Sequence, residues 1–93
     1  MGSSYRKGAY LEYKARDLLN ARGCTVVRSA GSKGPVDLVA TCARHVLFIQ
    51  VKASGQVRPA DLDKLRSVPI PARGAYREIW EWKNGTWSVT RLK

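Results

Sequence analysis

The chain has 93 residues, enough for one small domain, and 44% of them are apolar, so it can bury a core and is not expected to be disordered. It carries 17 lysines and arginines against 7 aspartates and glutamates, which gives a formal net charge of +10. This balance favours a polyanionic partner, because each phosphate that a cation neutralises releases counterions. The chain has no apolar run near the roughly 20 residues that cross a bilayer and no signal-peptide pattern, so we expect a cytoplasmic protein without a membrane partner.

Apolar spacing predicts a helix over residues 4–22, followed by Gly23 as a stop. Its apolar stripe comprises Leu11, Ala15, Leu18 and Leu19. Glu12 lies at the edge of this stripe, whereas a purely solvating glutamate would sit more comfortably on the opposite face. Glu12 is therefore a candidate functional acid, and a flanking surface acid is the alternative.

Three strands are predicted after this helix. They span residues 25–28, 36–41 and 45–52, and the turn-forming residues 29–35 predict a loop between the first two. The second and third strands are apolar apart from a few positions.

The polar positions in those two strands are Asp37, Gln50 and Lys52. A tight turn centred on Ala43 and Arg44 would pair the strands in antiparallel and place Asp37 directly opposite Gln50. Because side chains alternate along a strand, Lys52 points to the same face as Gln50. A longer, bulged loop would shift this register by one residue. Polar groups in buried strands cost free energy unless they are paired, so these three side chains form a candidate site.

The second half of the chain predicts a short helix over residues 60–67, then strands over residues 75–82 and 86–91. The dipeptide Asn84-Gly85 between these strands is a strong signal for a two-residue hairpin turn. Four hairpin side chains share one face: Trp80, Trp82, Trp87 and Val89. That face either packs on the core or its edge, or serves as a dimer contact or a platform for DNA. The element order predicts a single α/β domain over residues 1–93, with a mixed five-stranded sheet flanked by helices.

Cys24 and Cys42 are the only cysteines and lack the C-x-x-C spacing of zinc or redox sites. Each falls at the edge of a predicted strand, so we expect reduced, structural thiols that behave as small hydrophobes. His45 is the only histidine and is expected to open a strand. A histidine-rich zinc site and a Ser-His-Asp triad are therefore both disfavoured.

The candidate site has the chemistry of a magnesium centre, since Mg²⁺ prefers oxygen ligands in near-octahedral geometry. Asp37 is the obvious ligand, the Gln50 side chain and the Val51 carbonyl offer two more oxygens, and Glu12 would bind directly or through water. Lys52 would stabilise negative charge in the transition state. We expect Mg²⁺, with Mn²⁺ as a substitute, and no small-molecule cofactor. Such a site suits phosphodiester hydrolysis.

The loop beside this site carries groups that suit contact with phosphate. Arg28 flanks the loop, Ser29 and Ser32 offer hydroxyls, and Lys33 adds a positive charge.

Four blocks of the sequence together resemble the archaeal-type Holliday junction resolvases of the PD-(D/E)-x-K nuclease superfamily. The blocks are residues 5–9 with Glu12, residues 26–33, residues 36–40 and residues 50–52. The resemblance implies a restriction-endonuclease-like nuclease fold and a homodimeric, Mg²⁺-dependent endonuclease that cuts four-way DNA junctions in the cytoplasm of an archaeal, bacterial or phage-infected cell. It also implies that Glu12, Asp37, Gln50 and Lys52 occupy catalytic positions, and that Arg6, Lys7, Arg28 and Ser32 hold or orient the DNA strand.

The chain departs from this family at Gln50, where the family usually has glutamate. Glutamine removes one negative charge, which lowers the expected metal affinity. A junction-binding module with a weakened or dead nuclease site is therefore the main alternative. A nickase or repair endonuclease for other branched or mismatched DNA and a basic RNA-binding domain remain as further alternatives.

Overall fold

The computed structural model describes the backbone of residues 3–29 and 34–92 and the side chains from residue 9 onward within those ranges. Its elements are α1 (Ser3–Ala21), β1 (Thr25–Arg28), β2 (Leu38–Thr41), β3 (Val46–Ala53), α2 (Pro59–Arg66), β4 (Ala75–Lys83) and β5 (Thr86–Leu92). The strands form one sheet in the order β1-β2-β3-β4-β5. Only β3 and β4 run parallel among these neighbours, so the predicted mixed five-stranded sheet is confirmed.

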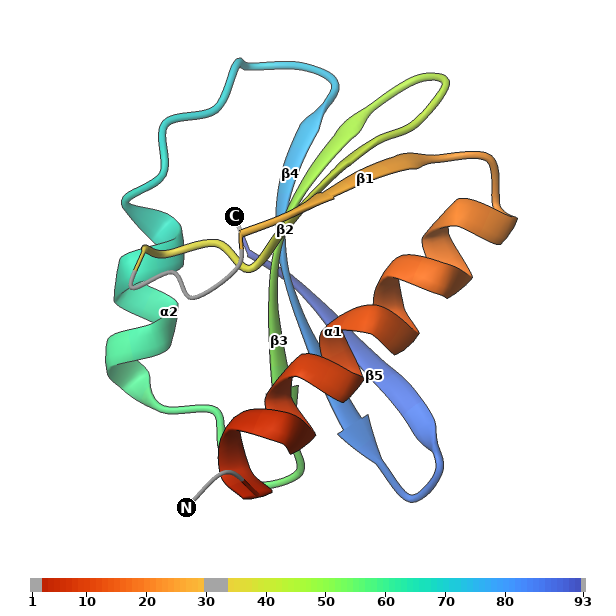
Figure 1. Ribbon diagram of the computed structural model, residues 1–93. Helices are drawn as coiled ribbons and strands as arrows, with labels where there is room; N and C mark the ends of the chain where they lie inside the picture. Colours follow the sequence, from red (N-terminus) through yellow and green to blue (C-terminus); the bar gives the residue numbers. More distant parts are fainter. Residues whose placement is uncertain (1–2, 30–33, 93) are drawn as a thin grey trace.

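The helix α1 packs on one face of the sheet, and α2 lies on the other side (Figure 1). Of the predicted stripe of α1, Leu11, Ala15 and Leu19 are buried there and Leu18 is partly buried. They pack against side chains from β2, β3 and β4: Leu38, Ala40, Leu47, Ile49, Val51 and Trp80. Gly23 follows the helix with a positive φ of 92°, a conformation that glycine adopts without strain and that stops a helix.

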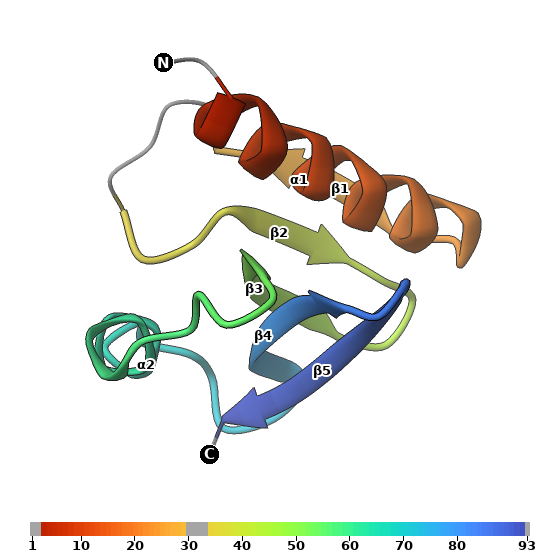
Figure 2. The same ribbon diagram turned by 90° about the horizontal axis from the view of Figure 1, so that it is seen from below.

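The helix α2 lies against the second face of the sheet (Figure 2). It is anchored there by Leu65, which is fully buried against Ile79 and Leu92. Its start is fixed by two residues. Pro59 occupies the first turn, where its missing N–H removes no hydrogen bond, and a carboxylate oxygen of Asp61 accepts the N–H of Arg58 at 3.0 Å.

The hairpin between β2 and β3 has the predicted register. Leu38 pairs with Ile49 and Thr41 with Val46, and the N–H of Cys42 donates to the carbonyl of His45 at 2.8 Å. The turn is therefore centred on residues 43–44, and the same register sets Asp37 opposite Gln50. The strand β2 begins two residues later than predicted, because the side chain of Asp37 takes a backbone N–H from β3 in place of a regular ladder bond.

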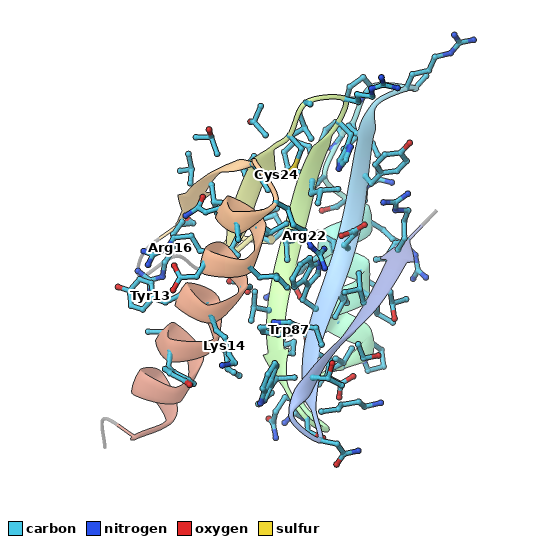
Figure 3. The ribbon with its side chains drawn as sticks, turned by 90° about the vertical axis from the view of Figure 1, so that its right-hand side faces the viewer. Tyr13, Lys14, Arg16, Arg22, Cys24 and Trp87 are labelled. Atoms are coloured by element: carbon cyan, nitrogen blue, oxygen red, sulfur yellow. A yellow bond between two sulfur atoms is a disulfide. The ribbon has the colours of Figure 1, made fainter. Side chains whose placement is uncertain are left out.

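The hairpin between β4 and β5 turns at Asn84 and Gly85, whose φ angles of 50° and 76° suit a two-residue turn. Trp80 is buried in the core below α1, and Trp82 and Trp87 pack against it at its edge with their ring centroids 5.0 Å apart. Lys14 points from α1 towards this hairpin and lies 4.8 Å from the ring of Trp82 (Figure 3). The interpretation of this face as core and core edge is confirmed for the three tryptophans, whereas Val89 is exposed.

The prediction of reduced cysteines is wrong, because Cys24 and Cys42 form a disulfide. The antiparallel ladder pairs Thr25 with Thr41, so the preceding and following cysteines meet across the same pair of strands, with Cα atoms 4.2 Å apart. The disulfide joins the start of β1 to the β2–β3 turn.

Within the described residues, neither helix is long and apolar enough to cross a membrane.

Candidate metal-dependent nuclease site

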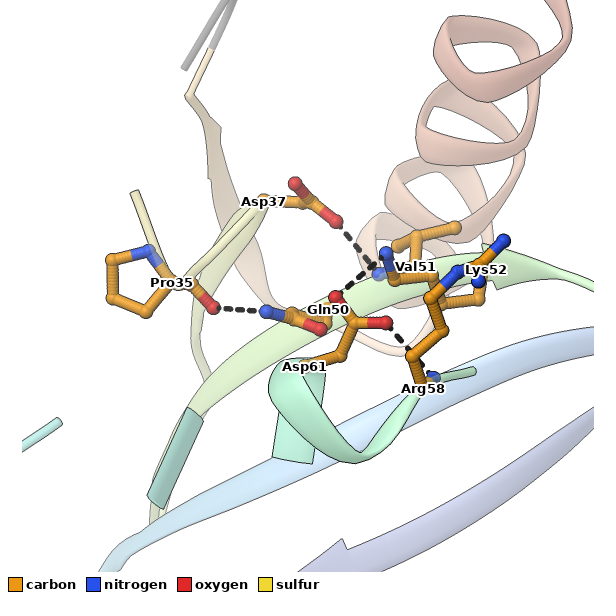
Figure 4. Close-up of polar contacts among 7 residues, drawn as sticks. All are labelled: Pro35, Asp37, Gln50, Val51, Lys52, Arg58 and Asp61. Atoms are coloured by element: carbon orange, nitrogen blue, oxygen red, sulfur yellow. Dashed lines mark hydrogen bonds and ion pairs between the residues drawn. The ribbon is translucent and has the colours of Figure 1, made fainter. Parts of the chain in front are cut away.

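Asp37 stands at the start of β2, where the sheet ends and the chain leaves for the loop. One of its carboxylate oxygens accepts the N–H of Val51 at 2.9 Å, and its own N–H donates to the carbonyl of Ile49 (Figure 4). Burial raises the pKa of Asp37, and the nearby charge of Asp61 adds to this, while the Val51 N–H and the Lys52 ammonium oppose it. A half-buried carboxylate with a raised pKa is a group that a cation would stabilise in its charged form.

Gln50 faces away from α1, since its neighbours Ile49 and Val51 both point into the core below that helix. The side chain is only 5% exposed. Its amide nitrogen donates to the carbonyl of Pro35 at 2.8 Å, and its oxygen, although buried, has no hydrogen-bond partner among the described residues. A buried carbonyl oxygen left without a donor is costly, and a metal ion would satisfy it.

Lys52 points to the same side of the sheet as Gln50. Its ammonium lies 3.2 Å from a carboxylate oxygen of Asp61 on α2, and the two side chains are 27% and 16% exposed. The acid Asp61 was not among the predicted site residues. The sequence offered only a weak signal for it, an acidic residue in the first turn of a short helix, which usually serves as a cap.

Glu12 lies on α1, the helix of the opposite face, and reaches the same end of the sheet. Its carboxylate accepts a hydrogen bond from Arg28 at 2.7 Å, and both side chains are largely buried. Burial raises the pKa of Glu12, the negative charge of Asp37 raises it further, and Arg28 opposes both. Glu12 and Asp37 are therefore close enough to repel each other when both are charged.

The predicted phosphate-contact residues are only partly described. Arg28 and Ser29 line an open groove of about 510 Å³ that also includes Asp37. Ser32 and Lys33 lie outside the described residues, as do the side chains of Arg6 and Lys7.

An arginine–tyrosine–arginine stack adjoins this groove and was not predicted. The ring of Tyr13 lies between Arg16 and Arg28, whose guanidinium carbons are 4.8 and 4.6 Å from its centroid. Tyr13 and Arg16 lie side by side on the outer side of α1 (Figure 3). The ring of Tyr13 thus gives Arg28 a second contact besides Glu12, and the stack adds positive charge near the groove.

These residues fit a divalent cation. The Gln50 oxygen without a partner among the described residues, the carboxylates of Asp37 and Glu12 and the nearby Val51 backbone together offer the oxygen donors that Mg²⁺ or Mn²⁺ prefers. Among the described residues no cluster of three or more histidine, cysteine, aspartate or glutamate side chains forms a metal site, so an amide or backbone oxygen would be needed to complete this one.

Comparisons with known proteins agree with this picture. A family model described as archaeal Holliday junction resolvase (Hjc) matches residues 3–67. The crossover junction endodeoxyribonuclease Hjc of Methanocaldococcus jannaschii is 41% identical over 71 residues, which cover 72% of this chain and 53% of the relative. The chain thus spans about half the length of that curated relative.

A solved structure of Archaeoglobus fulgidus Hjc, described as a Holliday junction resolvase from an archaeal hyperthermophile, superimposes with a TM-score of 0.65. The two chains share 25% sequence identity, and the match covers 91% of this chain and 72% of the other. This likeness confirms the predicted nuclease fold. Together with the family match, it shows that the chain belongs to the archaeal Holliday junction resolvase family.

Proposed function

We propose that this protein is a metal-dependent DNA endonuclease that resolves four-way junctions by cutting two strands. The observation that carries the proposal is the convergence of Asp37, Gln50 and Lys52 at one end of the sheet, where the buried Gln50 oxygen has no partner in the part of the chain that the structure describes. In a chain of this family, that arrangement supports a catalytic centre rather than a structural polar cluster.

The residues would divide the work of hydrolysis as follows. Asp37, Gln50, the Val51 carbonyl and Glu12 would hold Mg²⁺, with Mn²⁺ as a substitute. When bound, the cation would shield the charge of the scissile phosphate and activate water for attack. Lys52 would place its positive charge beside the phosphate oxygens, where charge develops in the transition state.

Binding of the strand would rely on the positive groups around the groove. Arg28 and Ser29 line it, and Arg6, Lys7, Ser32 and Lys33 are proposed to contact the backbone of the junction. Arg28 would have to exchange part of its contact with Glu12 for a phosphate, which would also release Glu12 towards the cation.

We further propose that the protein acts as a homodimer, because a two-fold pair matches the two-fold symmetry of a four-way junction and presents one site to each of two strands. Light scattering of the purified protein should give twice the chain mass of 10.3 kDa. A monomer that cuts both strands at once would contradict this part of the proposal.

The direct test is cleavage of an end-labelled synthetic four-way junction with Mg²⁺, beside a linear duplex with the same arm sequences. Paired nicks in the junction alone would support a resolvase. Cleavage of the duplex at the same rate would contradict selectivity for junctions, and cuts at other branched or mismatched substrates would favour a broader repair nuclease.

The second candidate is a junction-binding module with a disabled site, and Gln50 is the observation that favours it. The substitution Gln50→Glu separates the two functions. A carboxylate should bind the cation more tightly and keep or raise cleavage, although it loses the hydrogen bond to Pro35. If wild-type protein binds junctions without cutting and the variant cuts, the wild-type site is disabled.

A further inference from the structure

Lys52 is the positively charged side chain of the proposed site, yet it forms an ion pair with an acid on another element, α2. The carboxylate of Asp61 lies 3.2 Å from the lysine ammonium. Asp61 is not an obvious ligand or nucleophile, so the ion pair needs an explanation of its own.

Asp61 is the fixed member of this pair. One carboxylate oxygen accepts the N–H of Arg58 at 3.0 Å and the other faces Lys52, so both oxygens are engaged (Figure 4). The residue sits in the first turn of α2, where the helix dipole favours a negative charge. The helix itself is held on the sheet by the fully buried Leu65.

Lys52 is the adaptable member. Its charge sits at the end of a flexible four-carbon stem, and the side chain is partly exposed. Asp37 is close enough to feel the charges of both Lys52 and Asp61. Two carboxylates therefore compete for one ammonium, and only Asp61 is tied to a helix that fixes its position.

We propose that Asp61 is a positioning residue for Lys52. Asp61 holds the Lys52 ammonium at α2 and away from Asp37, so that the Asp37 carboxylate stays available to a divalent cation. An ammonium paired directly with Asp37 would occupy a metal ligand and repel the metal. This inference rests on the proposed function in so far as Asp37 is a metal ligand.

The test is a double-mutant cycle on metal binding in the absence of DNA. Binding of Mn²⁺ alone is measured by electron paramagnetic resonance for wild type, Asp61→Asn, Lys52→Met and the double variant. Asparagine keeps an acceptor for the Arg58 N–H, so the start of α2 is preserved. With Lys52 present, Asp61→Asn should weaken Mn²⁺ binding on the order of 10-fold, as losses of supporting contacts around a metal site do.

The coupling distinguishes positioning from a general charge effect. In the Lys52→Met background the same Asp61→Asn change should have little effect, because no ammonium remains to move onto Asp37. The conservative Asp61→Glu should restore Mn²⁺ binding, since glutamate keeps the negative charge that pairs with Lys52 and can also accept the N–H of the capping residue. Asp63→Asn is the matched control, because it removes the same charge from an exposed position of the same helix.

Three results would overturn the proposal. Equal weakening in both backgrounds would mean that Asp61 acts through its own charge or as a helix cap. Tighter Mn²⁺ binding by Asp61→Asn would mean that Asp61 sequesters Lys52 instead of positioning it. Absence of Mn²⁺ binding by wild type would contradict the assumption that Asp37 binds a divalent cation.

The junction assay keeps this proposal separate from the proposed function. If wild type cuts junctions but the cycle is additive, the positioning role of Asp61 fails and the function stands. If the cycle is coupled but wild type cuts no junction, the function fails and the positioning role stands.

Discussion

Backbone groups orient the two central side chains of the site. The N–H of Val51 holds one oxygen of Asp37, and the carbonyl of Pro35 holds the nitrogen of Gln50. Each side chain is thereby fixed without using the Gln50 oxygen, which stays open to the proposed cation. The hydrogen bond to Pro35 holds the Gln50 amide in one orientation, so that its oxygen would be the atom offered as a neutral ligand.

Asp37→Asn should abolish cleavage and stabilise the protein without metal. Loss of a carboxylate ligand is expected to cost on the order of 100-fold or more in turnover, comparable to removal of a single transition-state donor. Asparagine can still accept the Val51 N–H, so junction binding should remain. Because burial raises the pKa of Asp37, the folded chain holds this proton more tightly than the unfolded chain, and ionisation destabilises the fold.

The pH dependence of this effect has a definite sign. The destabilisation is absent below the unfolded pKa and is complete above the raised folded pKa, so the gain in Tm of Asp37→Asn over wild type should be positive at neutral pH and shrink towards about pH 4. Thermal unfolding of both proteins at several pH values measures it. A variant less stable than wild type at neutral pH would contradict the assignment.

At the scale of elements, the β2–β3 turn and the helix α2 position the side chains of the site. The turn at residues 43–44 fixes the register that sets Asp37 opposite Gln50, and α2 brings Asp61 to Lys52. The first relation is local and follows from loop length. The second depends on how α2 packs on the far face through Leu65, and no spacing in the sequence specifies it.

Removal of the disulfide should destabilise the fold while leaving the site intact. Cys24 and Cys42 are 18 residues apart, and closing a loop of this size is worth about 3 kcal/mol. For a domain of this length, that corresponds to a fall in Tm on the order of 10 °C. The measurement is thermal unfolding of wild type with and without a reductant, with thiol titration to verify reduction.

The double variant Cys24→Ser/Cys42→Ser is the control for this experiment. Its Tm should lie near that of reduced wild type and should not respond to reductant. Junction cleavage should persist below the lowered Tm, because the disulfide lies at the end of β2 opposite to Asp37. An unchanged Tm after full reduction would show that the covalent link adds nothing to stability.

At the scale of the whole molecule, charge is the dominant property. The net charge of +10 is spread along the chain, which has only 7 acidic residues. Three of these, Glu12, Asp37 and Asp61, belong to the site. Such a surface would attract DNA whatever its sequence, and these acids lie where the proposed cation would bind beside a phosphate.

Junction binding should therefore depend steeply on salt. If six to ten phosphates are contacted, affinity is expected to fall about 10³-fold or more between roughly 50 and 200 mM salt. Fluorescence anisotropy with a labelled junction and the Asp37→Asn protein measures this without cleavage, and a linear duplex of the same arms is the reference. An affinity that hardly changes with salt would contradict binding through the phosphate backbone.

The sequence by itself determined the elements, the mixed sheet and the register of the β2–β3 hairpin, because helical periodicity, strand alternation and short turns are local properties. It also identified Asp37, Gln50 and Lys52 as one patch, since register and alternation follow from loop length. It did not determine the disulfide or the Lys52–Asp61 and Glu12–Arg28 pairs. The pairing of β1 with β2 decided the disulfide, and the packing of α1 and α2 on opposite faces of the sheet decided the two ion pairs.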